Sequence, residues 1–420
     1  QHGLLCNCPL CSGTAGPGAP VDANDGTNVY VPPGNTKPVW TTDQIIQQLV
    51  RDGATWGPVG QAQTITYSFY TSLSQFPVGY GSGELTGFSA FTTAQQTAAV
   101  AALQCWADVA NVTFVYVADP TQAQICFANT TSGPGQAWGY YPSNYYQEGG
   151  DVWINPNQSS NFQLGFGGYG LLTLIHEIGH ALGLSHPGDY DAGSGLPITY
   201  ANNALYLQDS RMYTDMSYWS ASNTGGVHYG YASTALIDDI AAAQYLYGAK
   251  TTTRTGDTVY GFNSTAGADV YDFTKNTSPI VAIWDSGGFD TIDASGYSVS
   301  QTIDLNDGMF SSIGGMTYNV SIAFGAQIEG AVGGSGNDTI IANALNDVLK
   351  GGLGSDTYVF GAAWGNDSVQ DQGNLNTLKF TAGVTRSSLT FAQSGQDLVI
   401  TQSGSSNPIT VVGYFNNTAA

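Results

Sequence analysis

Two glycine-rich nonapeptides near the C-terminus constrain the fold of this chain more than any other feature. Residues 333–341 and 351–359 repeat the pattern G-G-x-G-x-D-x-U-x, where U is aliphatic, although Tyr fills that position in the second copy. A degraded copy, residues 342–350, lies between them. Such repeats wind a parallel β-roll, because the glycines permit tight turns and each Asp offers hard oxygen to Ca²⁺, which takes about 6–8 oxygen ligands. A flexible Gly-rich linker is the alternative, which two copies in register disfavour.

A histidine motif in the middle of the chain predicts a metal site. From His176 to His186 the sequence reads His-Glu-Ile-Gly-His-Ala-Leu-Gly-Leu-Ser-His, or H-E-x-x-H-x-x-G-x-x-H. On a helix, His176 and His180 lie one turn apart on one face, where both rings can reach a zinc ion at about 2.0–2.1 Å. Gly183 can adopt the positive φ that ends a helix, so that the chain reverses and His186 becomes a third ligand. Glu177 points beside the metal and can take a proton from water held there.

Chance does not explain this motif well. The chain has only 5 His among its 420 residues, and three of them fill the motif. The preceding apolar run, residues 171–175, predicts a buried helix that would hold the ligands rigidly. Three protein ligands leave one coordination position open, which is the catalytic rather than the structural arrangement of zinc.

About thirty residues downstream, Met216-Ser217-Tyr218-Trp219 is similar to the Met-containing turn of metzincins. Together with the histidine motif and the repeats, it makes the chain resemble a serralysin-type metzincin, a secreted bacterial zinc endopeptidase with a C-terminal calcium-binding RTX β-roll. The resemblance implies that Met216 forms a soft floor under the zinc ligands. It also implies that Tyr218 is a further zinc ligand that can move aside and help to stabilise the oxyanion. Ordinary packing would explain either residue taken alone.

The resemblance runs from about Trp40 to about Asp356. It covers residues 102–109, similar to the first large helix of the family, and residues 151–155, similar to its substrate-facing edge strand. It also covers two loops, 254–258 and 284–290, similar to additional calcium loops of the family, although Gly-Asp turns are common loop chemistry. The calcium-binding residues expected in the loops and the repeats are Arg254, Gly256, Thr258, Asp285, Gly287, Gly288, Asp290, Glu329, Gly334, Gly336, Asp338, Asn343, Leu345, Asp347, Gly352, Gly354 and Asp356.

The expected fold class is α+β, a metzincin zinc-protease domain followed by an all-β parallel β-roll. We expect three zones: an irregular Cys/Pro/Gly-rich leader or propeptide at 1–39, the metzincin catalytic domain at 40–250, and a calcium-binding β-roll with a β-sandwich-like C-terminal part at 251–420. Two capping boxes, periodic apolar residues and two alternating segments predict helices near 42–51 and 93–109, a helix bracketed by Ser233 and Gly248, and strands around 65–69 and 112–116.

The charge of the chain restricts its partners. With 31 Asp+Glu against 9 Lys+Arg, the formal net charge is −22, so nucleic acid and anionic membranes would repel it. No apolar run approaches the roughly 20 residues that span a bilayer. The resemblance to a protease family implies protein or peptide substrates, and we expect a small proteinaceous inhibitor as a further partner of a monomer. We also expect secretion from a Gram-negative bacterium, and no N-terminal signal peptide is visible from Gln1.

Cysteine is a departure from the family, which typically lacks it. Cys6, Cys8 and Cys11 could supply a thiolate that blocks the zinc of a zymogen, or they could form disulfides among themselves or with Cys105 and Cys126. We favour disulfides. The end of the chain also lacks an acidic-plus-aliphatic tail similar to the export signal of the family. Either the export element differs, or the chain is part of a longer product.

Zinc-assisted peptide hydrolysis is the function that these motifs predict, with Glu177 as the base and Tyr218 as an auxiliary oxyanion donor. Calcium would hold the C-terminal part folded outside the cell. A calcium-bound adhesion or surface-layer module with a vestigial zinc site is a rival, which the intact Glu177 and the three histidines disfavour. A narrow protease that cuts one partner or its own leader is a second rival, which the sequence leaves open.

Overall fold

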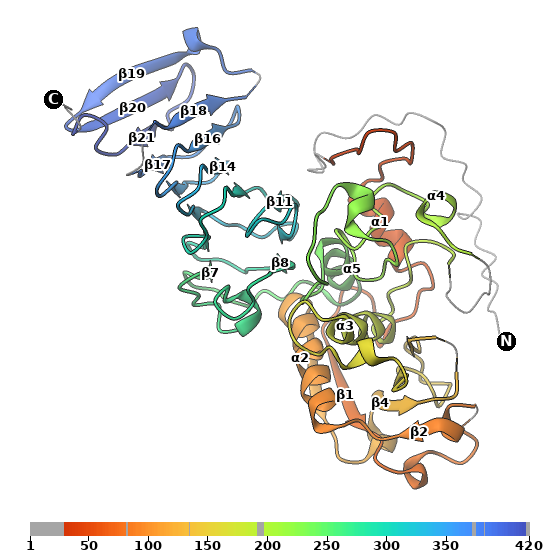
Figure 1. The fold of residues 1–420 in the computed structure, drawn as a ribbon. Helices are drawn as coiled ribbons and strands as arrows, with labels where there is room; N and C mark the ends of the chain where they lie inside the picture. Colours follow the sequence, from red (N-terminus) through yellow and green to blue (C-terminus); the bar gives the residue numbers. More distant parts are fainter. Residues whose placement is uncertain are drawn as a thin grey trace.

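The computed structural model describes residues 29–80, 83–133, 135–190, 197–371, 375–381 and 383–416. Figure 1 shows an elongated molecule in which an α+β part is followed by an all-β part that extends away from it. The strands nearest the C-terminus lie at the far end of the β part. The fold class expected from the sequence is therefore the one observed.

One mixed sheet underlies the α+β part. Its strand order is β3-β1-β4-β6-β5, all parallel except β5, and β2 pairs antiparallel with β4. The three residues of β6 are all buried because strands flank β6 on both sides, and β5 forms the edge of the sheet. The prediction that residues 151–155 form the edge strand is therefore wrong. The strands span β1 (Gln63–Phe69), β2 (Phe88–Ser89), β3 (Val112–Tyr116), β4 (Ile125–Thr130), β5 (Ala137–Gly139) and β6 (Val152–Ile154).

The helices begin largely where the sequence predicts them. Both predicted capping boxes are present, Thr41 with Gln44 and Thr92 with Gln95, each accepting and returning a hydrogen bond at a helix N-terminus. The α-helices span α1 (Thr42–Leu49), α2 (Thr93–Val109), α3 (Tyr169–Ala181), α4 (Tyr200–Asn203) and α5 (Ile237–Tyr247). Short 3₁₀ turns span η2 (Leu73–Gln75), η3 (Gly83–Gly87), η4 (Pro120–Gln122), η5 (Ser159–Phe162), η7 (Ala221–Thr224), η8 (Asp269–Tyr271) and η9 (Arg386–Ser388).

The start of α5 differs from the prediction. Leu236, not Ser233, occupies the N-cap, and the Asp239 carboxylate accepts the Leu236 N–H at 3.0 Å. The Ser233 hydroxyl instead accepts the Gly167 N–H at 2.9 Å. At the other end, Gly248 terminates the helix with φ +81°, as the sequence predicts.

The β part consists mainly of two parallel sheets between which the chain alternates. Gly330 pairs with Val348 in one sheet and Thr339 with Thr357 in the other, so each turn of the roll takes eighteen residues. The larger sheet contains β7 (Val259–Gly261), β9 (Thr291–Asp293), β13 (Gly330–Val332), β15 (Val348–Lys350), β17 (Asp367–Val369) and β21 (Ile409–Val411). The smaller contains β10 (Thr302–Asp304), β14 (Thr339–Ile341), β16 (Thr357–Phe360) and β18 (Thr377–Phe380).

Two further groups of strands complete this part. Strand β12 (Val320–Ile322) pairs in parallel with β8 (Val281–Ile283) and antiparallel with β11 (Phe310–Ser311). At the far end, β19 (Leu389–Ser394) and β20 (Asp397–Gln402) form an antiparallel hairpin, and β20 pairs antiparallel with β21. The last strands thus continue the larger sheet of the roll.

Stacked glycines explain the repeat pattern. Gly352 has φ +98° and Gly354 has φ +119°. A Cβ on Gly352 would lie 2.2 Å from the Gly334 oxygen of the preceding turn, and a Cβ on Gly354 would lie 2.1 Å from the Gly336 oxygen. The unusual Tyr358 keeps its ring in the core, while its hydroxyl accepts the Gly351 N–H at 2.7 Å. The hydroxyl therefore has a partner inside the roll.

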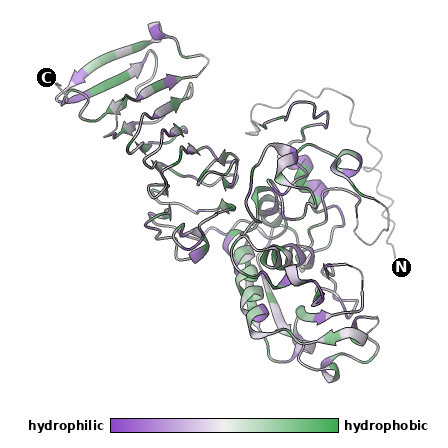
Figure 2. Ribbon diagram, in the orientation of Figure 1, coloured by the Kyte–Doolittle hydropathy of each residue, from purple (hydrophilic) through white to green (hydrophobic). Residues whose placement is uncertain are grey.

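The two parts share one hydrophobic core. The main cluster of buried side chains runs from Ile45 in α1 to Ile409 in β21, and Figure 2 shows hydrophobic stretches along α3 and α5. A second cluster joins Leu172 and Leu236 to Ile280 and Met316 of the β part. None of the described helices is both long and apolar enough to cross a membrane.

The described end of the expected leader, residues 29–39, lies against both the α+β part and the β part. The Pro38 carbonyl accepts the Leu207 N–H at 2.8 Å, and Tyr30 lies beside Tyr318 with ring centroids 6.1 Å apart. Directly after it, the Trp40 ring stacks on Tyr206. Residues 1–28, with Cys6, Cys8 and Cys11, lie outside the described residues.

Candidate metal centre and active-site cleft

Helix α3 and the turn after it place the three histidines of the motif. His176 and His180 lie on the last two turns of α3, and the Leu184 N–H returns to the Gly179 carbonyl at 2.9 Å. Gly183 has φ +107°, as predicted, and a Cβ there would lie 2.1 Å from the Ala54 oxygen. Only glycine fits this reversal, which carries His186 back toward the helix.

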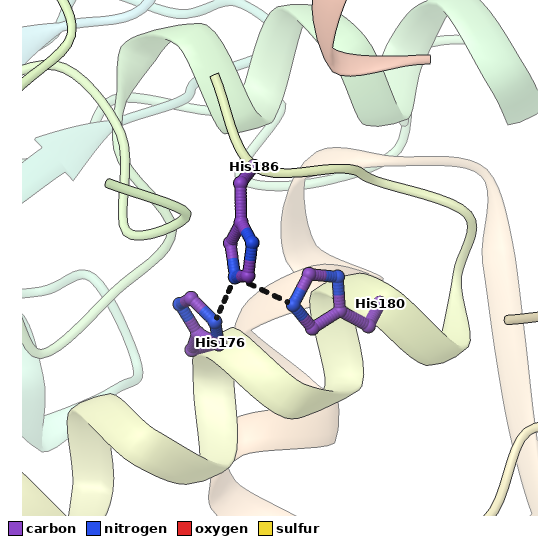
Figure 3. A group of neighbouring side chains, drawn as sticks. All are labelled: His176, His180 and His186. Carbon is purple, nitrogen blue, oxygen red and sulfur yellow. Dashed lines mark hydrogen bonds between the residues drawn. The ribbon is translucent and has the colours of Figure 1, made fainter. Parts of the chain in front are cut away.

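The three imidazoles converge through the same ring atom. The Nε2 atom of His186 lies 3.2 Å from that of His176 and 3.1 Å from that of His180, and dashed lines mark both contacts in Figure 3. Among the described residues, the ligand atoms of these three histidines lie close enough together to hold one metal ion.

Main-chain carbonyls fix the tautomer of each ring. A carbonyl oxygen can only accept, so each Nδ1 bonded to one carries the proton and each Nε2 presents a lone pair. Three lone pairs that face one another repel unless a cation lies between them. Tetrahedral zinc at about 2.0–2.1 Å would separate its ligand nitrogens by about 3.3 Å, close to the observed spacing. The Nδ1 acceptors are the carbonyl of Asp215 for His176 (2.7 Å), Leu184 for His180 (2.7 Å) and Tyr190 for His186 (3.1 Å).

Burial favours the neutral form of these rings. Burial, reinforced by the neighbouring His180, lowers the pKa of His176 to about 3. The same two causes, with His176 in addition, lower the pKa of His186 well below its ordinary value. Neutral imidazole is the form that binds metals, so both rings are prepared as ligands.

Glu177 lies beside the triad in the wall of the cleft. Its side chain is buried, the Gly139 amide donates a hydrogen bond to it, and its Oε2 atom has no partner. Burial raises the pKa of Glu177 to about 8. A carboxylate with a free oxygen and a raised pKa is suited to accept a proton.

The turn with Met216 and Tyr218 packs beneath and beside the triad. Met216 is fully buried, and its Sδ atom would lie 2.7 Å from a Cβ on Gly179, between the two helical histidines. The Tyr218 ring lies 4.6 Å from the His186 ring, centroid to centroid, and lines the cleft. Met216 and Tyr218 are therefore both close to the histidines.

Two buried aspartates that the sequence did not assign hold this turn. Asp239 accepts the Asp215 N–H at 2.7 Å and the Thr214 hydroxyl at 2.5 Å. Asp209 accepts hydrogen bonds from the Ser217 hydroxyl at 2.7 Å and the Tyr190 hydroxyl at 2.8 Å. Nothing in the spacing of the sequence connects Asp209 or Asp239 with this turn.

A cleft of about 830 Å³ runs past the triad. Strand β5, the first turns of α3 and the Met216 turn bound it, and β5 faces it with its free edge. The cleft is lined by Gly83, Glu84, Ser132, Gly133, Gly135, Gln136, Ala137, Trp138, Tyr140, Tyr169, Leu172, Thr173, His176, Glu177, Arg211, Asp215 and Tyr218.

Two more carboxylates in this lining escaped the sequence reasoning. Glu84 accepts the Tyr140 hydroxyl at 2.6 Å with one oxygen, and its other oxygen has no partner. Both carboxylate oxygens of Asp215 lack a partner, and burial together with nearby Asp239 raises the pKa of Asp215 well above its ordinary value. No motif marks either position.

The two expected calcium loops come together. A Cβ on Gly288 would lie 2.5 Å from the Gly256 carbonyl carbon, and Asp290 accepts the Thr258 N–H at 2.8 Å. Glu329 accepts the Asp290 N–H at 2.9 Å, and the second Asp290 oxygen has no partner.

Asp285 and Arg254 lie at the edge of this cluster. Asp285 binds the Gly287 N–H and the Tyr260 hydroxyl with its two oxygens. The Arg254 guanidinium forms an ion pair with Asp108 at 3.1 Å, and its φ is +48°.

In the repeats, aspartate carboxylates accept main-chain N–H groups from the neighbouring turn or from their own turn. Asp356 accepts the Asp338 N–H at 2.7 Å, and Asp347 accepts the Asn343 N–H at 2.9 Å. One oxygen of each of Asp347 and Asp356 is buried without a partner, which fits a hard cation. Both oxygens of Asp338 are engaged, by the amides of Gln301 and Gly334.

Asp367 shares this arrangement and was missed. It accepts the Asp347 N–H at 3.0 Å and keeps one buried oxygen without a partner. Gly365-Asn366-Asp367-Ser368-Val369 is the second half of the nonapeptide pattern, so the signal was present in the sequence. The Asn343 side-chain amide instead donates to the carbonyls of Leu305 and Ile328, which come from earlier segments of the β part.

Several known proteins are similar in sequence to this chain. Residues 249–417 match the family described as peptidase M10 serralysin C terminal. The chain is 50% identical to the metalloprotease AprA of Pseudomonas entomophila over 327 residues. This alignment covers 75% of the chain and 67% of that protein. The chain is 48% identical over 320 residues to serralysin B of Dickeya chrysanthemi, covering 73% of this chain and 65% of that protein.

The chain belongs to the serralysin family. The alignments span about two thirds of the length of these relatives. The resemblance inferred from the motifs is thereby confirmed, and zinc and calcium are the cofactors of this family of metalloproteases.

The two described cysteines are free thiols in this serralysin. The Cys105 thiol faces the Ser233 carbonyl at 3.6 Å, and the Cys126 thiol faces the Pro120 carbonyl at 3.5 Å. Burial raises the pKa of Cys105 to about 12 and that of Cys126 well above its ordinary value, so neither is a reactive thiolate.

Proposed function

We propose that this serralysin is a zinc-dependent endopeptidase. The observation that carries the proposal is the convergence of three Nε2 lone pairs in the wall of a long cleft, directly beside a buried carboxylate with a free oxygen. His176, His180 and His186 would hold the metal, with Tyr218 as a movable further ligand. When bound, zinc would polarise both the scissile carbonyl and a water molecule.

The residues of the chain divide the remaining chemistry. Glu177 would accept the proton of the attacking water on its free Oε2 and pass it to the leaving amine. The Gly139 amide holds the other side of this carboxylate in place. Tyr218 would donate its hydroxyl to the developing oxyanion. Met216 positions the helical histidines from below by filling the space over Gly179.

Strand β5 supports a substrate in extended form. It pairs with β6 on one side and lines the cleft with the other, so its free main-chain groups can pair with a peptide added as a further strand. Pairing through the main chain depends little on the side chains of the substrate. It therefore suits proteins and peptides as substrates generally.

We further propose that calcium holds the roll together. The loops contribute Arg254, Gly256, Thr258, Asp285, Gly287, Gly288, Asp290 and Glu329, and the repeats contribute Gly334, Gly336, Asp338, Asn343, Leu345, Asp347, Gly352, Gly354 and Asp356, to which the structure supports adding Asp367. Buried aspartate oxygens without partners support this assignment. Residues 40–250 and 251–420 would be the two functional domains.

The setting of the enzyme belongs to the same proposal. Its relatives are metalloproteases, and the acidic composition suits a calcium-rich exterior. We propose a monomer that acts outside a Gram-negative cell and that a small proteinaceous inhibitor could block by entering the cleft.

Cleavage of an unstructured protein such as casein tests the proposal. At equal zinc and calcium, Glu177→Gln should lower kcat/KM by about 10²–10⁴-fold, because it removes the proton acceptor. Zinc content measured by mass spectrometry should stay at one per chain, because the three histidines remain. Wild-type activity in Glu177→Gln would contradict the role of this residue, and an inactive wild-type chain would contradict the function.

A further inference from the structure

One carboxylate in the cleft has no role in the chemistry described above. The Asp215 side chain is 1% exposed, lines the cleft, and has no hydrogen-bond partner on either oxygen. Leaving a buried charged group without partners is costly. Most other buried carboxylates near the triad are engaged: Asp239 and Asp209 each accept several hydrogen bonds.

Arg211 lines the same cleft, and its charge partly offsets the effect of burial on the pKa of Asp215, but it forms no ion pair with that carboxylate. The Arg211 Nε donates to the Ser217 carbonyl at 3.0 Å, and its guanidinium lies over the rings of Tyr169 and Tyr231 at 5.8 and 5.7 Å. The ion pairs between described residues do not include one between Arg211 and Asp215. Behind Asp215 lies Asp239, a second acid that adds to the unfavourable potential.

Asp215 lies next to the reacting centre. It directly precedes Met216, and its main-chain carbonyl accepts the His176 Nδ1–H at 2.7 Å. Leu172 and Thr173, one turn before His176 on α3, line the same cleft. A substrate side chain that enters between α3 and the Met216 turn would therefore belong to a residue beside the scissile bond.

We propose that Asp215 is a specificity-determining residue that favours a lysine or arginine side chain of the substrate beside the scissile bond. The inference rests on the proposed function. A cationic side chain supplies both the missing donors and the missing charge, and two free oxygens match the paired donors of a guanidinium. The net charge of −22 would attract basic segments at longer range.

The test uses a set of peptides that differ at one residue flanking the cleaved bond, which is lysine, arginine, norleucine, glutamine or glutamate. Norleucine matches the lysine stem without its charge. Wild-type protein, loaded with zinc and calcium, should cleave the lysine peptide with a kcat/KM about tenfold or more above that of the norleucine peptide at one flanking position. Asp215→Asn should bring this ratio close to one while the norleucine peptide is still cleaved.

Two variants make the result specific. Glu84→Gln alters the other unassigned carboxylate of the cleft and should keep the lysine preference. If Asp215→Asn folds poorly, Asp215→Val removes the same charge with an apolar group, which a buried position tolerates well. Neither change touches the carbonyl that holds His176.

Binding separates this inference from the proposed function. In a Glu177→Gln background, fluorescence anisotropy should show tighter binding of the lysine than of the norleucine peptide, and the difference should vanish in Glu177→Gln/Asp215→Asn. Equal kcat/KM for lysine and norleucine at both flanking positions, a preference that survives in Asp215→Asn, or one that Glu84→Gln abolishes would each overturn the assignment. Binding preference without cleavage of any peptide would support Asp215 and count against the proposed function instead.

Discussion

Main-chain carbonyls do much of the work of assembling the triad. Each imidazole is oriented by one carbonyl, and these carbonyls come from the Met216 turn, the turn after α3 and the segment after His186. The histidine side chains therefore supply the ligand atoms, while the path of the backbone determines how the rings are oriented. Substitutions that displace the backbone near these carbonyls should weaken zinc binding as strongly as the loss of a histidine ligand.

Gly179 offers a direct test. A Cβ there would lie 2.7 Å from Met216 Sδ and 3.1 Å from the Trp106 ring. We expect Gly179→Ala to cost about 1–3 kcal/mol of unfolding free energy through overpacking and to weaken zinc binding. Thermal unfolding and zinc titration measure both effects.

Gly165→Ala is the matched control, because a Cβ at Gly165 meets open space and its φ is not positive. The two alanine variants should differ clearly in Tm. Equal Tm and equal zinc affinity would show that Met216 does not pack on the helix as described.

The sequence predicted the residues of the triad but not every residue of the cleft. The histidines and Glu177 occur at fixed spacing because one helix and one glycine turn position them, which is local geometry. Asp215 and Glu84 meet only in the folded cleft, from segments more than a hundred residues apart. The carboxylate oxygens without partners, both of Asp215 and one of Glu84, result from three-dimensional packing that no sequence spacing encodes.

At the scale of elements, local signals also succeeded where long-range ones failed. Helices α1 and α2 start at the predicted capping boxes because a cap needs only four consecutive residues. The positions of β5 and β6 in the sheet depend on pairing between strands, including pairing with strands that lie far away in the sequence. The resemblance of residues 151–155 to a family strand therefore indicated β6 correctly, but not that β5 would pair with its outer side.

Close stacking of the turns makes the roll sensitive to a single methyl group. A Cβ on Gly365 would lie 1.7 Å from the Leu345 oxygen, whereas one on Gly361, four residues earlier, would lie 3.8 Å from its nearest neighbour. Gly365→Ala should therefore destabilise the roll by about 1–3 kcal/mol and raise the calcium concentration needed to fold it.

Gly361→Ala is the control and should change stability by less than about 0.5 kcal/mol. Circular dichroism followed during calcium titration compares the two variants. Coincident calcium midpoints would contradict the stacked arrangement of these turns.

At the scale of the whole molecule, calcium and protons should compete. Burial raises the pKa of Asp347 to about 8 and that of both Asp356 and Asp367 to about 6. Unfolded Asp has a pKa of about 3.9. The folded, calcium-free chain therefore holds these protons more tightly than the unfolded chain does, and its stability should fall as the pH rises from about 4 to about 8.

Calcium binding near pH 6.5 should consequently release protons, and the apparent calcium affinity should rise with pH over the same range. Calorimetric titration in two buffers of different ionisation enthalpy measures the release. A binding heat that does not depend on the buffer would show that these aspartates are already ionised without calcium.

The reversal of strand direction at the end of the roll has a consequence for assembly. Parallel turns of the same length form a template, since each exposes the main-chain groups on which the next can be laid. Antiparallel β19 and β20 break that register on the larger sheet, and five of the six residues of β19 are exposed. A neighbouring molecule would meet an antiparallel strand there, so the larger sheet does not end on the parallel repeat that an identical turn of a roll could continue.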